Sequence, residues 1–396
     1  MDKSKRNWPG DPVRGIDWPE GVSRPIVTPL QPGVVYAAPD IDTLNAQYEG
    51  GAQGYTYSRE GHPNASVLAE KIDRLEGTTG GMMTGSGMGA VTAVMLGLLK
   101  SGDHVLGGDQ LYGRSLRMLT QDLPRFGIET SFADPTSADA VRNAIQPNTK
   151  LILVEVVSNP TLRIADMNAI YQIAREVGAL VVVDNTFTTP RGYRPFDHGA
   201  DVVLHSVTKL LAGHSDAMLG YVSARKAEHA QAIWDVIVTM GLTASPYDCW
   251  MAERGLYSFD LRFDRASENA RGLADMLADT AGVARVLYPS RADHPDVDRA
   301  QELLGGQFGN MVSFEIEGGH AAAQKLTEVI DMNFAPTLGD IGSTLSHPAS
   351  SSHRGLSAQA RNALGMSDGF FRLSVGIEEF SRLQRALSVA IEASQR

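Results

Sequence analysis

The stretch that decides the fold is DVVLHSVTKLLAGHSDAMLG, residues 201–220. Its apolar run of Val202, Val203 and Leu204 predicts a buried strand, which opens into a small polar cluster ending at Lys209. Lysine is almost never buried without a partner, because moving an ammonium group out of water is costly. Either the Lys209 side chain reaches solvent, or the interior requires an amine.

Outward from this stretch, short apolar runs alternate with helical patterns. Strands separated by helices predict a mainly parallel sheet covered on both faces, and therefore an α/β fold. The final two strands follow one another without a helix. The expected strands are HVLGG (104–108), IETSFA (128–133), LILVEVV (151–157), ALVVVD (179–184), ADVVLH (200–205) and MLGYVSA (218–224), and the expected helices lie near 64–76, 87–100, 113–126 and 166–177.

The two ends of the chain have a different character. Residues 1–60 are rich in Pro, Gly and aromatic residues without a sustained helical period, which indicates an ordered arm. After a helical stretch around 226–280, a smaller α+β unit follows, with strands at 310–318 and 370–376 and helices at 320–331 and 378–394. We therefore expect an arm over 1–60, an α/β domain over 61–255 and a C-terminal α+β domain over 256–396.

Composition excludes several functions. The chain has 396 residues, 43% of them apolar, and a formal net charge of -11 with both signs mixed throughout. Such a mixed, net negative charge does not indicate the basic patch that binding to nucleic-acid phosphates requires. The sequence contains no run of about 18 uncharged apolar residues, so we expect no membrane span. The one cysteine, Cys249, cannot form an internal disulfide, and the first residues have no apolar signal core, so we expect a cytoplasmic protein.

Three of the expected strands end in polar residues. In open α/β sheets, ligands bind beyond the carboxyl ends of the strands. An amide, an acid and an amine therefore converge at one edge of the sheet. The residues concerned are Ser158 and Asn159 after the first of these strands, Asp184 and Asn185 after the second, and Ser206, Thr208 and Lys209 after the third.

A glycine-rich turn supplies a fourth element of the same edge. The sequence MMTGSGMGAV places Ser86, Gly87 and Met88 at the start of an apolar helix, where free N–H groups and the helix dipole favour a phosphate. Pyridoxal phosphate requires all of these groups: a lysine for its aldehyde, a carboxylate for its pyridine nitrogen and a helix N-terminus for its phosphate. Burial would also lower the pKa of the lysine and favour the neutral, reactive amine.

The sequence resembles the Cys/Met-metabolism, or trans-sulfuration, family of pyridoxal-phosphate enzymes, which includes cystathionine γ-synthase, cystathionine lyases, methionine γ-lyase and O-acetylhomoserine sulfhydrylase. The resemblance implies a fold-type I, aspartate-aminotransferase-like subunit in a homotetramer of two catalytic dimers. The matching stretches are YTYSREGHPNAS (55–66), TGSGMGAVTAV (84–94), DQLYGRS (109–115), VEVVSNPT (154–161), DNTFTTPRGYRPFDHGADVVLHSVTKLLAGHSD (184–216), TLGDIGSTLSHPAS (337–350) and GFFRLSVGIEE (369–379).

The resemblance also implies roles toward the cofactor. Lys209 would form the Schiff base and carry protons, Asp184 would pair with the pyridinium, and Tyr112 would stack on the ring and assist proton transfer. The phosphate would be held by two backbone N–H groups, two hydroxyls and two residues of the neighbouring subunit's arm. These are Gly87 and Met88, Ser206 and Thr208, and Tyr57 and Arg59.

Toward the substrate, the resemblance implies that Arg372 binds the α-carboxylate with its two-pronged fork, a task that lysine performs poorly. Asn159 would lie near the cofactor's 3′-oxygen and the same carboxylate. Arg372 in a surface ion pair, and Tyr57 and Tyr112 as ordinary half-buried aromatics, are the alternative interpretations.

Some positions depart from the family pattern. His62 and Asn64 replace the usual Asn and Thr after the YSR motif, and Thr337 stands where a serine helps to orient the substrate carboxylate. Gly342 occupies a position at which many cystathionine-handling members carry Glu. Arg114 stands where methionine γ-lyases carry Cys, so it is either an anchor for an acidic distal group of the substrate or part of a surface salt bridge.

The remaining candidates have simpler interpretations. His205, His214 and His347 lack metal-ligand spacing and are expected to pack or form hydrogen bonds, and Cys249 is expected to be a buried apolar residue. We therefore expect no metal and a small amino-acid substrate. The expected reaction is elimination or replacement at the γ-carbon of a sulfur-containing or other γ-substituted L-amino acid. Alternatives are cystathionine β-lyase, O-acylhomoserine sulfhydrylase or methionine γ-lyase activity, and further an aminotransferase or an inactive cofactor carrier.

Overall fold

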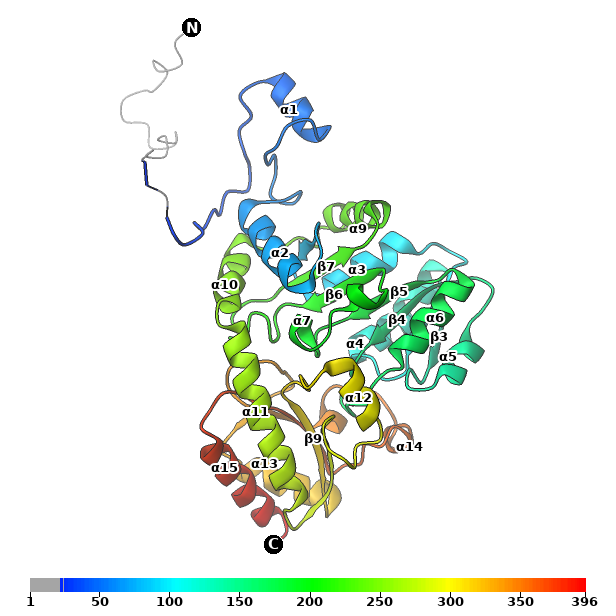
Figure 1. Ribbon diagram of the computed structural model, residues 1–396, viewed down its shortest axis with the longest axis vertical. Coiled ribbons are helices and arrows are strands. Elements are labelled where there is room, and N and C mark those ends of the chain that lie inside the picture. Colours follow the sequence, from blue (N-terminus) through cyan, green and yellow to red (C-terminus); the bar gives the residue numbers. More distant parts are fainter. Residues whose placement is uncertain (1–21, 24) are drawn as a thin grey trace.

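The structure is a computed structural model that describes residues 22–23 and 25–396. The part of the expected arm before residue 22 lies outside the described residues. Figure 1 shows residues 25–60 extending from the body of the molecule at the end opposite the C-terminus. The arm contains one helix that the sequence analysis did not expect, α1 (Ile41–Tyr48), whose first turn is capped by Asp40 through the N–H of Thr43.

The central sheet has seven strands in the order β1-β7-β6-β5-β4-β2-β3. The five strands from β6 to β3 run parallel, whereas β7 is antiparallel to both β6 and β1. The expected α/β class with a mainly parallel sheet is therefore confirmed. The strands are β1 (Met82–Thr84), β2 (His104–Gly108), β3 (Glu129–Ala133), β4 (Thr149–Glu155), β5 (Leu180–Asp184), β6 (Val202–Ser206) and β7 (Gly220–Ala224).

Helices cover both faces of this sheet, which explains the continuous apolar runs of its strands. Along β5, Val182 packs in the core beside α3 (Gly87–Leu98) and α9 (Ala227–Thr239). Its neighbours Val181 and Val183 pack in the opposite core with α6 (Met167–Val177). Alternate residues of one strand thus enter two cores, and the polar residue that ends the strand is left at the edge of the sheet.

One expected helix, at 113–126, is divided into three parts. It begins as α4 (Gly113–Arg117), continues as a π-helical turn, η2 (Met118–Asp122), and ends as a 3-10 turn, η3 (Leu123–Phe126). Pro124 has no amide hydrogen with which to continue the α-helical pattern. The Thr120 hydroxyl also donates to the carbonyl of Leu116 at 2.9 Å, a contact that bends helices.

The second sheet has five strands in the order β10-β11-β12-β9-β8. Long helices pack on it and place apolar residues in the core that it shares with one face of the first sheet. Its elements are β8 (Val283–Leu287), β9 (Met311–Ile316), β10 (Asn333–Phe334), β11 (Thr344–Ser346) and β12 (Phe370–Ser374), with α11 (Phe259–Ala278), α12 (Val297–Leu304), α13 (Gly319–Val329), η4 (Pro348–Ser350), α14 (Ala358–Ala363) and α15 (Phe380–Ser394).

The remaining helices are α2 (Pro63–Glu76), α5 (Ala138–Ala144), α7 (Thr189–Gly192), α8 (Pro195–His198) and α10 (Pro246–Leu256). Leu68 and Ile72 of α2 share a third core with Ala252 of α10. The expected boundary near residue 255 falls at the end of α10, between the last strand of the first sheet and the first strand of the second. Within the described residues, the structure contains no helix with the length and apolarity needed to cross a membrane.

Candidate active site

A cavity of about 250 Å³ lies beyond the carboxyl ends of β4, β5 and β6, at the start of α3. This is the edge of the sheet at which the polar strand ends are expected to converge. The cavity brings together ten of the thirteen candidate site residues: Gly87, Met88, Tyr112, Asn159, Asp184, Ser206, Thr208, Lys209, Thr337 and Arg372.

Lys209 lies in the interior of this site. Its Nζ donates to the Thr337 hydroxyl at 3.2 Å, and burial, reinforced by the charge of Arg372, lowers the pKa of the Lys209 amine. The backbone of the lysine is packed against Gly339, whose φ is +79° and at which an added Cβ would lie 2.6 Å from the amide nitrogen of Leu210. Glycine at this position therefore permits the loop that carries Thr337 to approach the lysine.

Asp184 ends β5 beside the lysine loop. Its Oδ1 accepts hydrogen bonds from the backbone N–H of Thr186 at 3.1 Å and from the Thr186 hydroxyl at 2.5 Å. Burial raises the pKa of Asp184, while both Thr186 bonds and the nearby His205 act in the opposite direction and favour the carboxylate. A half-buried carboxylate without an ion-pair partner among the described residues is suited to pairing with a cationic ring nitrogen.

The start of α3 forms a cradle for an anion. The Ser86 hydroxyl caps the helix by accepting the N–H of Gly89 at 3.0 Å, while the N–H groups of Gly87 and Met88 precede the first intrahelical bonds. A Cβ on Gly87 would lie 2.7 Å from the Cβ of Ser206, so only glycine lets the helix start approach β6 this closely. The Thr208 hydroxyl, by contrast, is bonded to the backbone of Leu219. Residues present at this end of the cavity therefore fit a phosphate group.

Arg372 is buried at the other end of the cavity, with 5% of its surface exposed. It donates to Asn159 Oδ1 at 2.7 Å and to the Thr337 carbonyl at 2.9 Å, while its Nε has no hydrogen-bond partner. Burial lowers the pKa of Arg372 to about 10. No ion pair within the described residues neutralises this guanidinium. A buried cation with an unsatisfied donor fits a carboxylate ligand.

Two candidate residues of the arm, Tyr57 and Arg59, lie outside this cavity. The Arg59 guanidinium is 5.4 Å from the centre of the Tyr57 ring and donates to the Val238 carbonyl at 3.3 Å. Arg59 lines a separate cavity of about 170 Å³ together with Trp234 and Thr243. Within one subunit, these two residues therefore do not reach Lys209.

Arg114 is also outside the cavity: it is exposed, and no ion pair described in the structure involves it. The surface salt bridge expected for Arg114 is therefore not formed with any described residue, and its role as a distal anchor stays a prediction. Gly342 donates its N–H to Asp340 and leaves ordinary van der Waals space for a side chain, with Glu378 3.8 Å from an added Cβ.

The two departures near the YSR motif have structural contacts. His62 caps α2 by accepting the N–H of Ala65 at 3.1 Å, and its other ring nitrogen bonds to the Ala244 carbonyl. Asn64 accepts the N–H of Gln31 and donates to the Pro29 carbonyl. Asn64 therefore attaches the arm to α2, whereas His62 joins the start of α2 to the segment before α10.

The histidine and cysteine candidates have the structural roles expected for them. His205 pairs with Glu76, His214 bonds to the Ala212 carbonyl, and His347 bonds to Ser350 and to the Asp368 carbonyl. Cys249 is fully buried as a free thiol, and burial raises its pKa. The expectation of a buried, apolar cysteine is confirmed.

The structure adds residues that sequence reasoning missed. Glu155 ends β4, lines the cavity and accepts the N–H of Tyr112 at 2.6 Å. A single acidic residue inside the apolar run LILVEVV was the available signal. The other additions are Val91, Ser115, Thr186, Phe187, Met218, Pro336, Leu338, Ser351 and Ser352.

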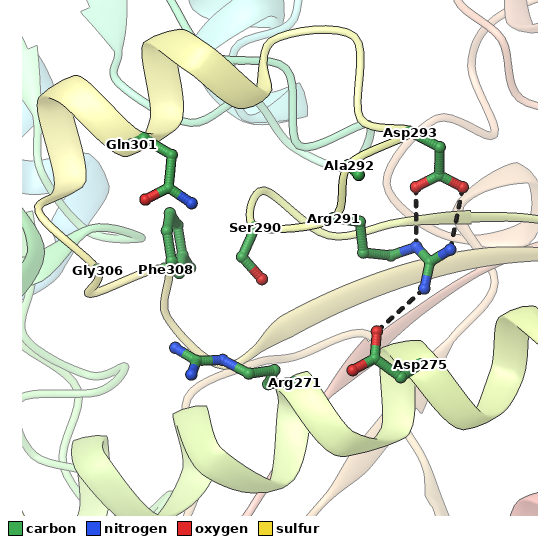
Figure 2. Close-up of a pocket in the computed structure, with 9 residues that line it drawn as sticks. All are labelled: Arg271, Asp275, Ser290, Arg291, Ala292, Asp293, Gln301, Gly306 and Phe308. Carbon is green, nitrogen blue, oxygen red and sulfur yellow. Dashed lines mark hydrogen bonds and ion pairs between the residues drawn. The ribbon is translucent and has the colours of Figure 1, made fainter.

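A second, larger cavity of about 690 Å³ lies between α11 and the segment before α12 (Figure 2). Arg291 in this cavity is held by both oxygens of Asp293 and by Asp275 at 3.1 Å. Its charge is therefore already neutralised, and none of the lysines that the structure describes lines the cavity. The arrangement lacks the convergent strand ends of the site around Lys209.

The lysine, the buried carboxylate, the anion cradle and the unpaired arginine together define the class of the protein: a fold-type I pyridoxal-phosphate enzyme. A profile of the family described as Cys/Met metabolism PLP-dependent enzyme matches residues 17–392. The chain belongs to this family, and it is a pyridoxal-phosphate-dependent enzyme of trans-sulfuration.

Its relatives have several related activities. The chain is 41% identical to cystathionine beta-lyase MetC of Bacillus subtilis (strain 168), covering 85% of this chain and 86% of the relative. It is 38% identical to cystathionine gamma-lyase of the same organism, covering 89% and 92%. The crystal structure of cystathionine gamma synthase from Xanthomonas oryzae pv. oryzae in complex with cystathionine matches with a TM-score of 0.88 and 37% identity, covering 93% of this chain and 94% of that one.

Proposed function

We propose that the protein catalyses elimination or replacement at the γ-carbon of a sulfur-containing or other γ-substituted L-amino acid, as cystathionine γ-lyases and γ-synthases do. The observation that carries this proposal is the placement of Lys209 and Arg372 in one cavity, joined through Thr337, which accepts from both side chains. This arrangement offers a carboxylate anchor and a base to the same α-amino acid.

The residues of the cavity have distinct roles in this proposal. Arg372 binds the substrate α-carboxylate and Asn159 orients the guanidinium, so that the α-carbon lies near the Lys209 amine. The Gly87 and Met88 N–H groups and the Ser206 hydroxyl hold the cofactor phosphate, and Asp184 pairs with the ring nitrogen. When bound, pyridoxal phosphate supplies an electron sink for the pair left by the departing α-proton.

Departure of a γ-group requires the removal of a second proton, from the β-carbon. Burial and Arg372 lower the pKa of the Lys209 amine, which favours its neutral form. This amine would take the α-proton, release it to C4′ of the cofactor, and so be free again to take the β-proton. Tyr112 lines the same cavity, and its phenol is available to protonate the leaving group. The products would be a 2-oxo acid and ammonia when water completes an elimination, or a new thioether when a thiol replaces the departing γ-group.

The second candidate is β-elimination, since the relative at 41% identity is named cystathionine beta-lyase. It requires removal of the α-proton only. O-acylhomoserine sulfhydrylase and methionine γ-lyase activities are variants of the first proposal with other leaving groups. An inactive carrier is disfavoured, because a carrier has no use for a buried carboxylate anchor such as Arg372. The order of the YSR, LYG and SVTK motifs along the chain argues against an aminotransferase.

Product analysis with L-cystathionine tests the choice directly. Cleavage at the γ-carbon gives L-cysteine, 2-oxobutanoate and ammonia, whereas cleavage at the β-carbon gives L-homocysteine, pyruvate and ammonia. We expect 2-oxobutanoate, or net synthesis of cystathionine from L-cysteine and an O-acylhomoserine. Pyruvate as the only 2-oxo acid, without replacement activity, would assign the β-lyase function instead.

We further propose a cytoplasmic homotetramer of two catalytic dimers in which Tyr57 and Arg59 complete the phosphate site of the neighbouring subunit. The absence of both residues from the cavity of their own subunit supports this assignment. Mixed dimers of inactive Arg59→Ala and Lys209→Ala chains should regain activity, because one of their two sites carries neither change. Verified heterodimers without any recovery would contradict the shared site.

A further inference from the structure

Glu155 is a buried acid in the active site to which the proposed reaction assigns no role. It is the last residue of β4, 8% of its surface is exposed, and it lines the same cavity as Lys209. In the pairing of β4 with β5, Glu155 lies directly beside Asp184. The site thus contains two neighbouring carboxyl groups, although pairing with the cofactor ring uses only one.

The contacts of Glu155 lead to Tyr112. Glu155 Oε1 accepts the backbone N–H of Tyr112 at 2.6 Å, and Tyr112 is the N-cap of α4 without a side-chain cap of its own. Two residues earlier, Gln110 is bonded to the segment after β4 through the hydroxyls of Ser158 and Thr161. The backbone before α4 is therefore attached to the end of β4 at two points, one of which is the Glu155 carboxyl.

The two carboxyl groups have unequal environments. Asp184 accepts two hydrogen bonds from Thr186, whereas Glu155 accepts a single backbone N–H. Burial and the charge of Asp184 raise the pKa of Glu155 well above its ordinary value, against the opposing effects of the Tyr112 N–H and of Arg372. Two adjacent buried carboxyls do not both ionise readily, and the better solvated one keeps the charge.

We propose that Glu155 is a positioning residue that, as a neutral carboxylic acid, fixes the backbone of Tyr112 at the mouth of the cavity. The carbonyl oxygen of a neutral acid accepts the Tyr112 N–H as an amide oxygen does. The Tyr112 side chain is 43% exposed, so its backbone is the part that the protein can hold in place. If Glu155 is neutral, Asp184 carries the only negative charge of the pair at the ends of β4 and β5. The inference rests on the proposed function, because it assigns Tyr112 to proton transfer.

Glutamine at position 155 is the matched test, since it has the shape and the hydrogen-bonding groups of a neutral glutamic acid. Glu155→Gln should keep kcat/KM within about threefold, whereas Glu155→Ala should lower it about tenfold or more through the lost hydrogen bond. If Glu155 acts through Tyr112, the double variant Glu155→Ala/Tyr112→Phe should have the kcat/KM of Tyr112→Phe alone. Equal losses in the Gln and Ala variants, or fully additive losses in the double variant, would overturn the proposal.

Infrared difference spectroscopy of the cofactor-free protein tests the protonation state without any activity. Wild type minus Glu155→Gln should show the C=O stretch of a protonated carboxyl group at neutral pH. Carboxylate bands alone would overturn the proposal, even if Glu155→Ala failed to fold. Failure of the proposed function has a different signature, because it alters the products that the wild-type enzyme makes from L-cystathionine and leaves this spectrum unchanged.

Discussion

Replacing Arg372 by lysine isolates the role of its two-pronged geometry from that of its charge. The guanidinium donates to Asn159 at 2.7 Å and to the Thr337 carbonyl at 2.9 Å, which leaves its remaining donors for a substrate carboxylate. An ammonium group retains the charge but cannot make the same set of planar contacts. Loss of a hydrogen bond to a buried charged group costs about 1.5–3 kcal/mol, which corresponds to a decrease in kcat/KM of roughly tenfold to 150-fold.

The assay is steady-state turnover of L-cystathionine, normalised to the bound cofactor measured by its visible absorbance. We expect Arg372→Lys to retain its cofactor and to lose kcat/KM mainly through a higher KM. Arg291→Lys is the matched control, because Arg291 also forms a fork with a carboxylate but lies in the separate cavity of Figure 2. An unchanged KM in Arg372→Lys, or an equal rise in the control, would refute the assignment of Arg372 as the carboxylate anchor.

Three further predictions concern pH and specificity. Burial and Arg372 lower the pKa of Lys209, so the rate at which cofactor-free protein binds pyridoxal phosphate should increase with pH and level off below the ordinary lysine pKa. Arg372→Met should move this increase to higher pH, not lower. Burial, with nearby Arg372 and Arg361, lowers the pKa of His353 to about 4. Between this pKa and the ordinary value of 6.5, the unfolded chain binds more protons than the folded one, so the free energy of unfolding in urea rises with pH. His353→Asn should remove about 3 kcal/mol of this rise. An unaltered slope of unfolding free energy against pH would contradict the assignment to His353. Finally, if Arg114 is the distal anchor, Arg114→Ala should reduce the preference for acidic over neutral distal groups, and an unchanged preference would remove this role.

The parallel strands could be predicted because each is apolar on both faces and ends in polar residues. Asp184 and Lys209 were found in this way, since the topology of parallel strands brings their carboxyl ends to one edge whatever the packing between them. The start of α3 could also be predicted from the sequence, because Ser86 is a typical helix cap and the glycines after it permit a close approach to β6.

Glu155 was missed because it stands within a run that is typical of a buried strand, and periodicity alone does not show where that strand ends. The structure ends β4 at Glu155, so the residues after it form a loop that carries Asn159. The interruption of the expected helix at 113–126 was missed for a related reason. Its apolar residues have helical spacing, and the effects of Pro124 and of the Thr120 hydroxyl are local.

The positions of Tyr57, Arg59 and Arg114 could not be derived from the strand or helix pattern of the sequence. The two arm residues lie against each other outside the cavity of their own chain, a position that only the family resemblance, and not the strand or helix pattern, led us to expect. Arg114 lies two positions after Tyr112, which lines the cavity, and is exposed to solvent. The direction of a side chain beyond a tight turn depends on contacts that a single sequence does not specify.

Locating the lysine that binds the cofactor tests the assignment of this site. The protein loaded with pyridoxal phosphate is reduced with borohydride, digested and mapped by mass spectrometry, with Lys209→Ala treated in parallel. We expect a phosphopyridoxyl group on Lys209 in the wild-type protein and the loss of this adduct in the variant. An adduct on another lysine in the wild type, with Lys209 unmodified, would show that this strand-end lysine is not the catalytic amine.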